Sequence, residues 1–411
     1  MHILLITQYF HPEIGAAASR WGDYVKLLIK KGHKITVLCQ MPNYPHGKIF
    51  DGYKNQWFKK EILSNNLTII RSGVWANNRK SKLKLLGNYL SFALSGSINS
   101  FKIKNYDLVI ISSPPLFVGI IAIIIKKIKK SLILLDLRDI WPESVVALGG
   151  LKSKWLLMLG RRLEKLLYSS VDGYIFPVPG FKNYFRKSFP DQLKKPMFNL
   201  MNGIDKEFIN ESLKFNQEDQ KDFIVLYSGN LGLAQGLEVV IKTAELLIDY
   251  PIQFKLIGSG LEKELLINLT KSKKLNNINF EDTMPRTQLI KEMNKATVCL
   301  VPLKKNKLFE NAIPSKIFEI MACGKPSILG VKGEAEKIII NNNCGLIVEP
   351  GNPNEYRNAI LTYYNNHNLL KTHGDNGVKY VTEYMQKEYL LSEFLSQLKN
   401  KVKELSLNIN I

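Results

Sequence analysis

Short apolar runs alternate with helical stretches along the chain, and this alternation limits the possible folds more than any other feature. ILLIT near the N-terminus is followed by a helical stretch at residues 21–31 and then by KITVLC, and DLVII, SLILL and GYIF lie between later amphipathic segments. Runs that are apolar along their whole length are typical of parallel strands covered on both faces. The sequence therefore predicts an α/β fold with doubly wound parallel sheets.

The same rhythm starts again in the second half of the chain. FIVLYSG begins at Phe223, and QFKLIGSG, INF, ATVCLVP, PSILG and GLIVEP follow. A chain of 411 residues is long enough for two domains of ordinary size, and a polar stretch after the turn signal Asn202-Gly203 resembles a connector. We predict two Rossmann-like domains, residues 1–200 and 201–385, facing each other across a cleft. A helix within residues 386–411 is expected to dock on one of them, with the first as the candidate.

The charge of the chain points to an anionic partner. Its 57 Lys and Arg exceed its 36 Asp and Glu, which gives a net charge of +21. We find no helix-turn-helix, zinc finger or aromatic-studded sheet, so nucleic acid is not expected, and a membrane surface or a nucleotide diphosphate fits better. The uncharged apolar run at residues 116–125 is about half as long as a membrane-spanning helix, so no such helix is predicted.

The four cysteines, at positions 39, 299, 323 and 344, have no paired spacing. This pattern indicates neither a zinc site nor a disulfide framework. We therefore expect no metal site and a reducing, cytoplasmic environment.

Two glycine-containing loops follow predicted strands and precede predicted helices. In HPEIGAAASR, Gly15 and Ala16 let backbone N–H groups approach an anion at the positive end of a helix. In LYSGNLGLAQGLE, Ser228, Gly229 and Asn230 end a strand, and a helix is expected to start near Gln235. Either loop could instead be a simple strand-to-helix turn, but both suit a diphosphate. Neither contains GxGxxG, which disfavours a dinucleotide oxidoreductase.

Two further clusters carry charge. NAIPSKIFEIMACGKPSI places Ser315, Lys316 and Glu319 at a helix start, where the lysine could offset phosphate charge and the glutamate could accept hydrogen bonds from ribose hydroxyls. An ordinary surface ion pair is the alternative. LLDLRDIWPESV brings four charged residues out of a buried strand, which favours a ligand site over a solvated loop. These residues are Asp136, Arg138, Asp139 and Glu143.

Taken in order, YFHPEIGAA, SSPP, RDIWPES, YSGNLGLAQGLE and IPSKIFEIMACGKP resemble the motifs of glycosyltransferase family 4. These are retaining enzymes of GT-B fold, and the likeness is to their WbuB-like subgroup, named for an L-fucosamine transferase. The resemblance implies that the second domain binds the donor, with Glu319 on the ribose and the backbone at Gly15 and Ala16 on the diphosphate. Ile313, Ser315 and Lys316 of the IPSK motif join this donor-binding set.

The sequence departs from the family pattern in two places. Asn311 stands where a second glutamate is expected, separated from Glu319 by seven residues, and Asn230 and Gln235 replace the usual Arg and Lys of the phosphate loop. Arg286 or Lys316 is therefore expected to supply the positive charge.

The family's chemistry implies that the diphosphate leaves from the face that the acceptor attacks, so neither a protein nucleophile nor a metal is expected. Asp139 is the candidate for orienting the acceptor, with Arg138 beside it. The resemblance implies a hexosyltransferase that moves an N-acetylated hexosamine or deoxyhexosamine from a UDP-sugar to a polyprenyl-diphosphate-linked glycan. Its expected place is the inner face of the cytoplasmic membrane, in O-antigen, lipopolysaccharide, capsule or exopolysaccharide synthesis.

Two basic stretches with interleaved apolar residues, from Asn77 and at residues 116–130, are candidates for contact with anionic lipid. The first is the better candidate, because the second reads as a buried helix with a solvated end. Two other functions stay open: a nucleotide-sugar 2-epimerase of the same architecture, and a non-catalytic basic scaffold at a lipid surface.

Overall fold

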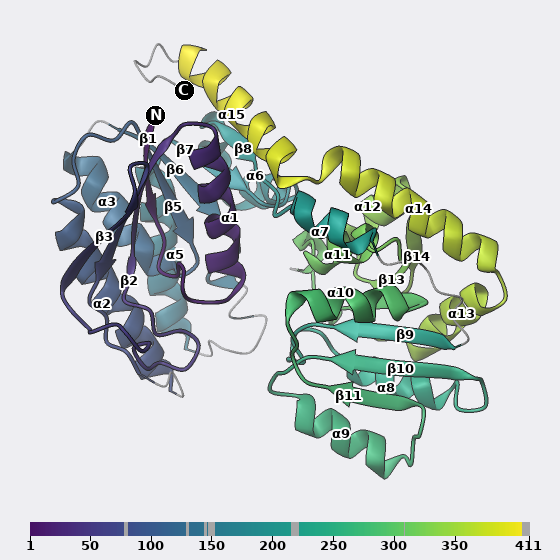
Figure 1. Ribbon diagram of the computed structural model, residues 1–411. Helices are drawn as coiled ribbons and strands as arrows, with labels where there is room; N and C mark the ends of the chain where they lie inside the picture. Colours follow the sequence, from purple (N-terminus) through teal and green to yellow (C-terminus); the bar gives the residue numbers. More distant parts are fainter. Residues whose placement is uncertain are drawn as a thin grey trace. The chain divides into compact units, whose positions relative to one another are not determined.

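The computed structural model describes residues 1–77, 81–128, 131–143, 146, 153–214, 222–307 and 309–404. The chain divides into two compact units: Met1–Met201 together with the segment that starts at Leu391, and Asn202–Leu390 (Figure 1). Each unit is built around one largely parallel sheet with helices on its faces, so the predicted α/β fold class is confirmed.

The first unit contains an eight-stranded sheet in the order β3-β4-β2-β1-β5-β6-β7-β8. Its strands are β1 (His2–Ile6), β2 (Lys34–Gln40), β3 (Phe58–Ser64), β4 (Leu67–Ser72), β5 (Leu108–Ser113), β6 (Leu132–Leu137), β7 (Gly173–Phe176) and β8 (Met197–Asn199). The pairing is parallel except that β3 runs antiparallel to β4 at the edge. The pattern of apolar runs missed β3, because FKKEILS is charged and mostly exposed.

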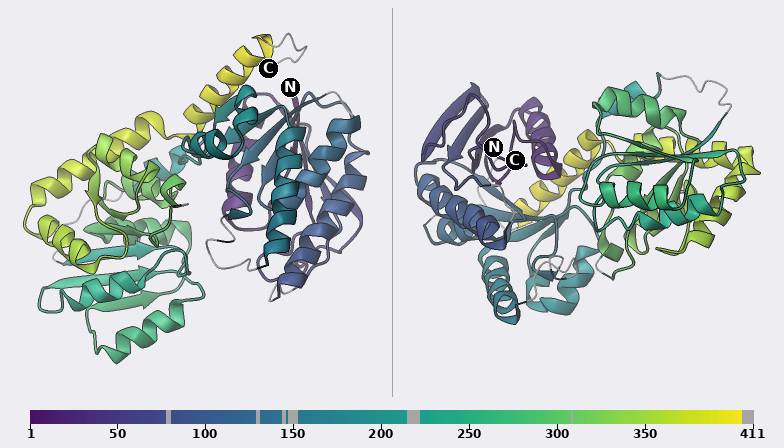
Figure 2. Two further views of the ribbon diagram at one scale, coloured as in Figure 1. Left: turned by 180° about the vertical axis from the view of Figure 1, so that it is seen from behind. Right: turned by 90° about the horizontal axis from the view of Figure 1, so that it is seen from below.

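Three helices on one face of this sheet form a continuous layer. They are α2 (Lys82–Ser100), α3 (Gly119–Ile128), which follows the short helix η1 (Leu116–Val118), and α5 (Lys154–Ser170). Helix α3 contacts both α2 and α5 (Figures 1 and 2). A Cβ atom at Gly119 would lie 2.7 Å from the side chain of Leu167, so glycine is what allows α3 and α5 to approach this closely.

The remaining helices of the first unit are α1 (Ala16–Lys30), α6 (Phe181–Ser188), the short η2 (Pro190–Lys194) and most of α15 (Lys387–Glu404). Helix α15 brings the end of the chain back onto this unit. Its buried residues include Leu391, Phe394 and Leu398, and the Phe394 ring meets Phe198 of β8 edge to face at 5.8 Å.

The second unit contains six parallel strands in the order β11-β10-β9-β12-β13-β14. They are β9 (Phe223–Ser228), β10 (Ile252–Ile257), β11 (Ile278–Glu281), β12 (Val298–Pro302), β13 (Ser327–Gly330) and β14 (Gly345–Ile347). The helices are α7 (Lys206–Ser212), α8 (Glu238–Glu245), α9 (Lys263–Ser272), α10 (Arg286–Lys295), η3 (Phe309–Asn311), α11 (Lys316–Ala322), α12 (Glu334–Asn341), α13 (Pro353–Tyr364) and α14 (His367–Tyr384).

The core of this unit lies between β9, β10, β12 and helices α8 and α13, where Val225, Leu300, Val240 and Ile360 are buried. Helix α8 starts at Glu238, so the predicted start near Gln235 was wrong. Gly236 has a φ of 61°, a left-handed conformation that cannot continue into a right-handed helix. None of the helices in the described part of the chain combines the length and the apolar content that crossing a bilayer requires.

Candidate functional site

The order of the strands in the second unit marks where a ligand is expected. From β9 the chain adds β10 and β11 on one side of the sheet and then returns to place β12 on the other side of β9. Open α/β sheets bind ligands outside the carboxyl ends of the strands at such a reversal. The loop that begins at Gly229, after β9, and Leu303 and Lys304, after β12, lie at these ends.

The loops after β9 and β10 pack against each other through their backbones. Gly229 and Gly258 have φ values of 137° and 153°, and a Cβ atom at Gly258 would lie 1.9 Å from the carbonyl oxygen of Gly229. The N–H of Gly229 donates to the Ile257 carbonyl at 2.9 Å, and that of Leu231 to the Ser259 carbonyl at 2.8 Å. Gly229 was singled out in the sequence. Gly258 was not, although GSG directly after a strand is a recognisable signal.

Lys316 extends from the start of α11 to this pair of loops. Helix α11 starts at Lys316, directly after Ser315, so the helix start predicted at these residues is confirmed. The Lys316 Nζ atom lies 4.0 Å from the centroid of the Tyr227 ring, and a Cβ atom at Gly229 would be 2.9 Å from the same Nζ. Burial lowers the pKa of Lys316 to about 8, while nearby Glu319 acts in the opposite direction. Among the described residues Lys316 forms no ion pair, so its ammonium is available to an anionic ligand.

Arg286, the other predicted source of positive charge, is already engaged. Its Nη2 atom lies 3.1 Å from the Asp205 carboxylate, and its guanidinium stacks 4.8 Å from the Phe208 ring centroid. Lys387 Nζ donates to the same Asp205 at 2.8 Å. Burial alone would raise the pKa of Asp205, but Lys387 and Arg286 together hold it below its ordinary value. Asp205 could not be identified from the sequence, because its partners Arg286 and Lys387 are distant in the chain.

Glu319 lies one helical turn after Lys316 on α11. Burial raises the pKa of its carboxyl, an effect that Arg286, Lys316 and Lys387 oppose. The structure therefore brings three predicted donor-site residues, Lys316, Glu319 and Arg286, into one electrostatic environment.

The predicted polar residues of the loop after β9 lie close together. A Cβ atom at Gly232 would lie 2.6 Å from Asn230 Nδ2 and 3.3 Å from Gln235 Oε1. Gln235 Oε1 is buried and lacks a hydrogen-bond partner among the described residues. Ser228 is the last residue of β9 and is buried. Asn311 ends η3, and Ile313 lies in the short loop between η3 and α11.

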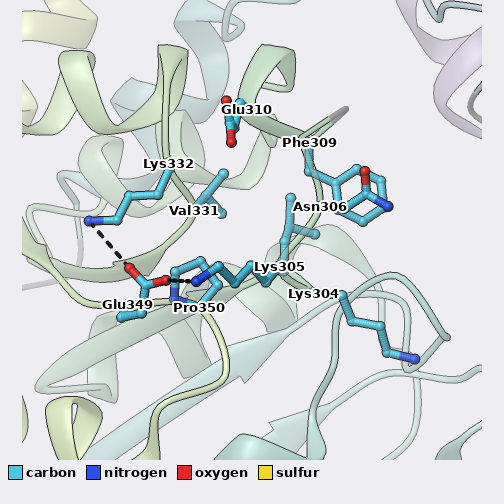
Figure 3. A pocket seen from close by; sticks show the side chains of 10 residues that line it. Lys304, Lys305, Asn306, Phe309, Glu310, Val331, Lys332, Glu349 and Pro350 are labelled. Atoms are coloured by element: carbon cyan, nitrogen blue, oxygen red, sulfur yellow. Dashed lines mark ion pairs between the residues drawn. The ribbon is translucent and has the colours of Figure 1, made fainter. Parts of the chain in front are cut away.

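A small pocket opens at the carboxyl ends of β12, β13 and β14 (Figure 3). Glu349 lies between two of its lysines, at 2.6 Å from Lys305 and 3.9 Å from Lys332, and Lys332 also contacts Glu336 at 3.2 Å. Because these cations are already neutralised by carboxylates, the pocket is a weaker anion site than the surroundings of Lys316.

In the first unit, Gly15 and Ala16 lie where the loop after β1 enters α1. Gly15 has a φ of 152°, and no side chain caps α1, which leaves N–H groups at its start for a ligand. Glu13 holds this loop in place. Its buried carboxylate accepts hydrogen bonds from the N–H groups of Asn43 and Tyr44 at 2.8 and 2.9 Å, and burial raises its pKa. The sequence analysis assigned Glu13 no role.

The SSPP and RDIWPE motifs meet at the ends of β5 and β6. The N–H of Arg138 donates to the Ser113 carbonyl at 2.9 Å, and its Nη2 donates to the Pro114 carbonyl at 2.7 Å. Burial lowers the pKa of Arg138, and Asp136 opposes this shift. Asp139 follows, half-buried, and accepts a hydrogen bond from the N–H of Ile140 at 2.8 Å.

Asp136 differs from the other charged residues of this cluster, because it faces the interior. It is fully buried and accepts hydrogen bonds from Arg20 at 2.9 Å, Trp21 Nε1 at 2.8 Å and Ser112 Oγ at 2.8 Å. The interpretation of Asp136 as part of a ligand-facing cluster was therefore wrong: it joins α1, β5 and β6. Residues 144–145 of the same motif lie outside the described residues, as do residues 78–80 and 129–130 of the two basic stretches.

Comparison with known proteins shows what the second unit resembles. The family described as Glycosyl transferases group 1 matches residues 208–380, which lie within that unit. This part of the chain is therefore similar to a glycosyl transferases group 1 domain. WcaI of Escherichia coli K12, whose name places it in colanic acid biosynthesis as a glycosyl transferase, is 24% identical over 97% of this chain and 100% of its own length. WbjE of Pseudomonas aeruginosa, named as a glycosyltransferase, is 24% identical over 52% of this chain and 55% of its own.

Solved structures share the fold of the whole chain. Sucrose-phosphate synthase from Thermosynechococcus elongatus superposes with a TM-score of 0.76 at 18% identity, covering 98% of this chain and 99% of its own. HepE of Anabaena, solved in complex with UDP-glucose, has a TM-score of 0.68 at 14% identity, covering 97% and 100%. The group 1 domain and these likenesses support a glycosyltransferase of GT-B fold. Membership of family 4 and of its WbuB-like subgroup stays a prediction.

Proposed function

We propose that the protein is a retaining glycosyltransferase of the hexosyl type that moves a sugar from a UDP-sugar onto a lipid-linked saccharide of a bacterial surface polysaccharide. The group 1 domain supports sugar transfer. The name of WcaI supports a surface polysaccharide, and the UDP-glucose complex of HepE supports a uridine nucleotide. An N-acetylated hexosamine or deoxyhexosamine is the proposed sugar.

The observation that carries this proposal is the ammonium of Lys316 beside the loop after β9. It lies at the reversal point of the sheet, next to Gly229, at the carboxyl end of β9. A cation kept partly out of water interacts more strongly with a phosphate than an exposed one does. This arrangement suits the diphosphate of a nucleotide-sugar.

In the proposed reaction Lys316 and the loop N–H groups stabilise the negative charge that grows on the leaving diphosphate, while Glu319 holds the ribose hydroxyls. The leaving phosphate accepts the proton of the acceptor hydroxyl as the new glycosidic bond forms on the same face, so the configuration at the anomeric carbon is retained. Arg138 and Asp139 of the first unit orient the acceptor, whose lipid would place the enzyme at the cytoplasmic face of an anionic membrane.

The decisive test offers the purified protein a panel of UDP-, GDP- and dTDP-sugars together with a polyprenyl-diphosphate-linked sugar, and follows the lipid product by mass spectrometry. A mass gain of one sugar, given by a UDP-sugar, is expected, and NMR coupling constants of the product should show the anomeric configuration of the donor. Interconversion of free donors without a lipid product would indicate the epimerase, and the absence of any reaction would favour the scaffold. Tight binding of GDP but not UDP would contradict the proposed nucleotide.

Replacing Glu319 by alanine is expected to weaken UDP binding by about 10- to 100-fold, because hydrogen bonds to a charged group are lost. Isothermal titration calorimetry measures the effect. Glu334→Ala is the matched control, since Glu334 pairs with Lys337 on α12 and should leave the affinity unchanged. Equal affinities of Glu319→Ala and the unaltered protein would remove Glu319 from the site.

Transfer is expected to continue at an unchanged rate after treatment with EDTA. The positive charge that a divalent ion would supply to the diphosphate comes instead from Lys316. A rate that collapses with EDTA and returns when Mg²⁺ or Mn²⁺ is added would show that the site needs a metal.

A further inference from the structure

The outer surface of the layer formed by α2, α3 and α5 is unusually apolar. On α2 the exposed side chains include Leu83, Leu90, Leu94 and Ile98, and Leu94 is 60% exposed. Residues at spacings of four and seven lie on one side of a helix, so these four form a continuous stripe. Large apolar side chains that gather on a surface, rather than being scattered singly, mark an interaction site.

Helix α5 repeats the pattern and adds charge. Trp155, Leu159 and Leu166 are 63%, 49% and 58% exposed, and exposed Arg162 and Lys165 lie among them. The spacing puts Trp155, Leu159, Arg162 and Leu166 on one side of the helix. Helix α5 was not among the stretches predicted to contact lipid.

Helix α3 lies between the other two helices and also exposes both apolar and basic side chains. Ile120, Ile123 and Ile124 are half-exposed, and Lys126 and Lys127 at its end are exposed. Because α3 contacts both α2 and α5, the three helices form one layer, and their exposed apolar side chains lie on the outer face of that layer.

The three helices bring charges of one sign to this face. Helices α2 and α3 contain no Asp or Glu, and the one acidic residue of α5, Glu164, is buried. The three helices contribute eight Lys and Arg residues. Two of these, Lys126 and Arg161, pair with Asp172 and Glu143 of neighbouring segments, and Arg162 and Lys165 are exposed. A second copy of this chain would bring like charges to the same face, and a nucleic acid would leave the leucines and isoleucines without partners. Apolar side chains set among cations, with an exposed tryptophan, fit the interface of an anionic phospholipid bilayer.

We propose that the outer face of α2, α3 and α5 docks the first unit on an anionic phospholipid surface. Leu94, Trp155, Leu159 and Leu166 enter the headgroup region, and Arg162 and Lys165 contact lipid phosphates. The inference rests on the proposed function in that it gives a lipid-linked acceptor a place to meet the enzyme, but lipid binding does not depend on the identity of the donor.

Co-sedimentation of the full-length protein with vesicles tests the proposal. Vesicles of phosphatidylcholine mixed with phosphatidylglycerol should bind the protein, and vesicles of phosphatidylcholine alone should bind it far less. Leu94→Glu and Leu166→Glu should each weaken binding by about 10-fold or more, since each loses apolar burial. Arg162→Glu should weaken it by more than about 5-fold.

Leu265→Glu is the matched control, because Leu265 is a similarly exposed leucine, 61% exposed, on α9 of the second unit. It should bind vesicles as the unaltered protein does, and circular dichroism should show the same helix content for all variants. Equal loss in Leu265→Glu, or binding indifferent to phosphatidylglycerol, would overturn the proposal. A dimer in analytical ultracentrifugation that Leu94→Glu or Leu166→Glu dissociates would overturn it too, by assigning the face to self-association. UDP binding by the same variants reports separately on the proposed transferase site.

Discussion

Replacing Lys316 by methionine is expected to lower kcat/KM for sugar transfer by about 100- to 1000-fold, because removing one preorganised charge from a leaving-group site has an effect of this size. Methionine keeps the length of the side chain and its packing on Tyr227, so the loss would come from the charge. Steady-state kinetics with the donor identified by the panel measures it.

Lys332→Met is the matched control, because Lys332 lies near the same edge of the sheet but already contacts Glu336 and Glu349. It should change kcat/KM by less than about 3-fold, as expected for a surface ion pair. Lys316→Arg should recover only part of the activity, since guanidinium is larger and differs in geometry from an ammonium. A Lys316→Met enzyme with full activity would place the diphosphate elsewhere.

The pH dependence of kcat/KM gives a second measurement of the role of Lys316. Burial brings the pKa of Lys316 down from its ordinary value of 10.5 to about 8, so in the free enzyme the ammonium loses its proton as the pH rises through about 8. Donor binding needs the protonated form, and kcat/KM should therefore fall on the alkaline side of about pH 8. In Lys316→Arg this alkaline fall should disappear, because the guanidinium stays charged.

Replacing Asp136 by alanine is expected to lower the free energy of unfolding of the first unit by about 3 to 5 kcal/mol, because the substitution leaves the buried Arg20 guanidinium without its carboxylate partner. The loss should lower the melting temperature of that unit by about 6 to 20 °C. Differential scanning calorimetry can measure this shift and compare it with the transition of the second unit.

Asp136→Asn should be less damaging than Asp136→Ala, because an amide oxygen can still accept from Trp21 or Ser112. Glu238→Ala is the control, since Glu238 and Lys242 form an exposed pair that contributes less than about 1 kcal/mol. A melting temperature that Asp136→Ala leaves unchanged would mean that the network around Asp136 does not stabilise the unit.

Most of the parallel strands were predictable because they are apolar along most of their length, as in FIVLYS for β9 and LILLDL for β6. The hairpin of β3 and β4 was not, since β3 is an exposed edge strand whose charged residues resemble a loop. Helix α8 began later than predicted because Gly236 is left-handed, in a loop whose Ala234 carbonyl accepts a hydrogen bond from the N–H of Lys304, a residue far away in the sequence.

The position of the candidate site could also be predicted in part from the sequence. Gly229 follows a predicted strand, and Lys316 starts a predicted helix, so both were found. Their proximity, and the ring of Tyr227 beneath the ammonium, required the fold. The sequence could not separate Lys316 from Arg286 as the available cation, because Arg286 is engaged by Asp205, 81 positions away in the chain.

The return of α15 to the first unit has a consequence for how the protein is made. The second unit, Asn202–Leu390, is a continuous piece of chain, whereas the first is completed by residues from Leu391 onward. During synthesis the second unit can fold as soon as it emerges, while the first must wait with β8 and Phe198 uncovered until Phe394 arrives. A ribosome that stops early would therefore leave the N-terminal half, the part translated first, as the unfinished one.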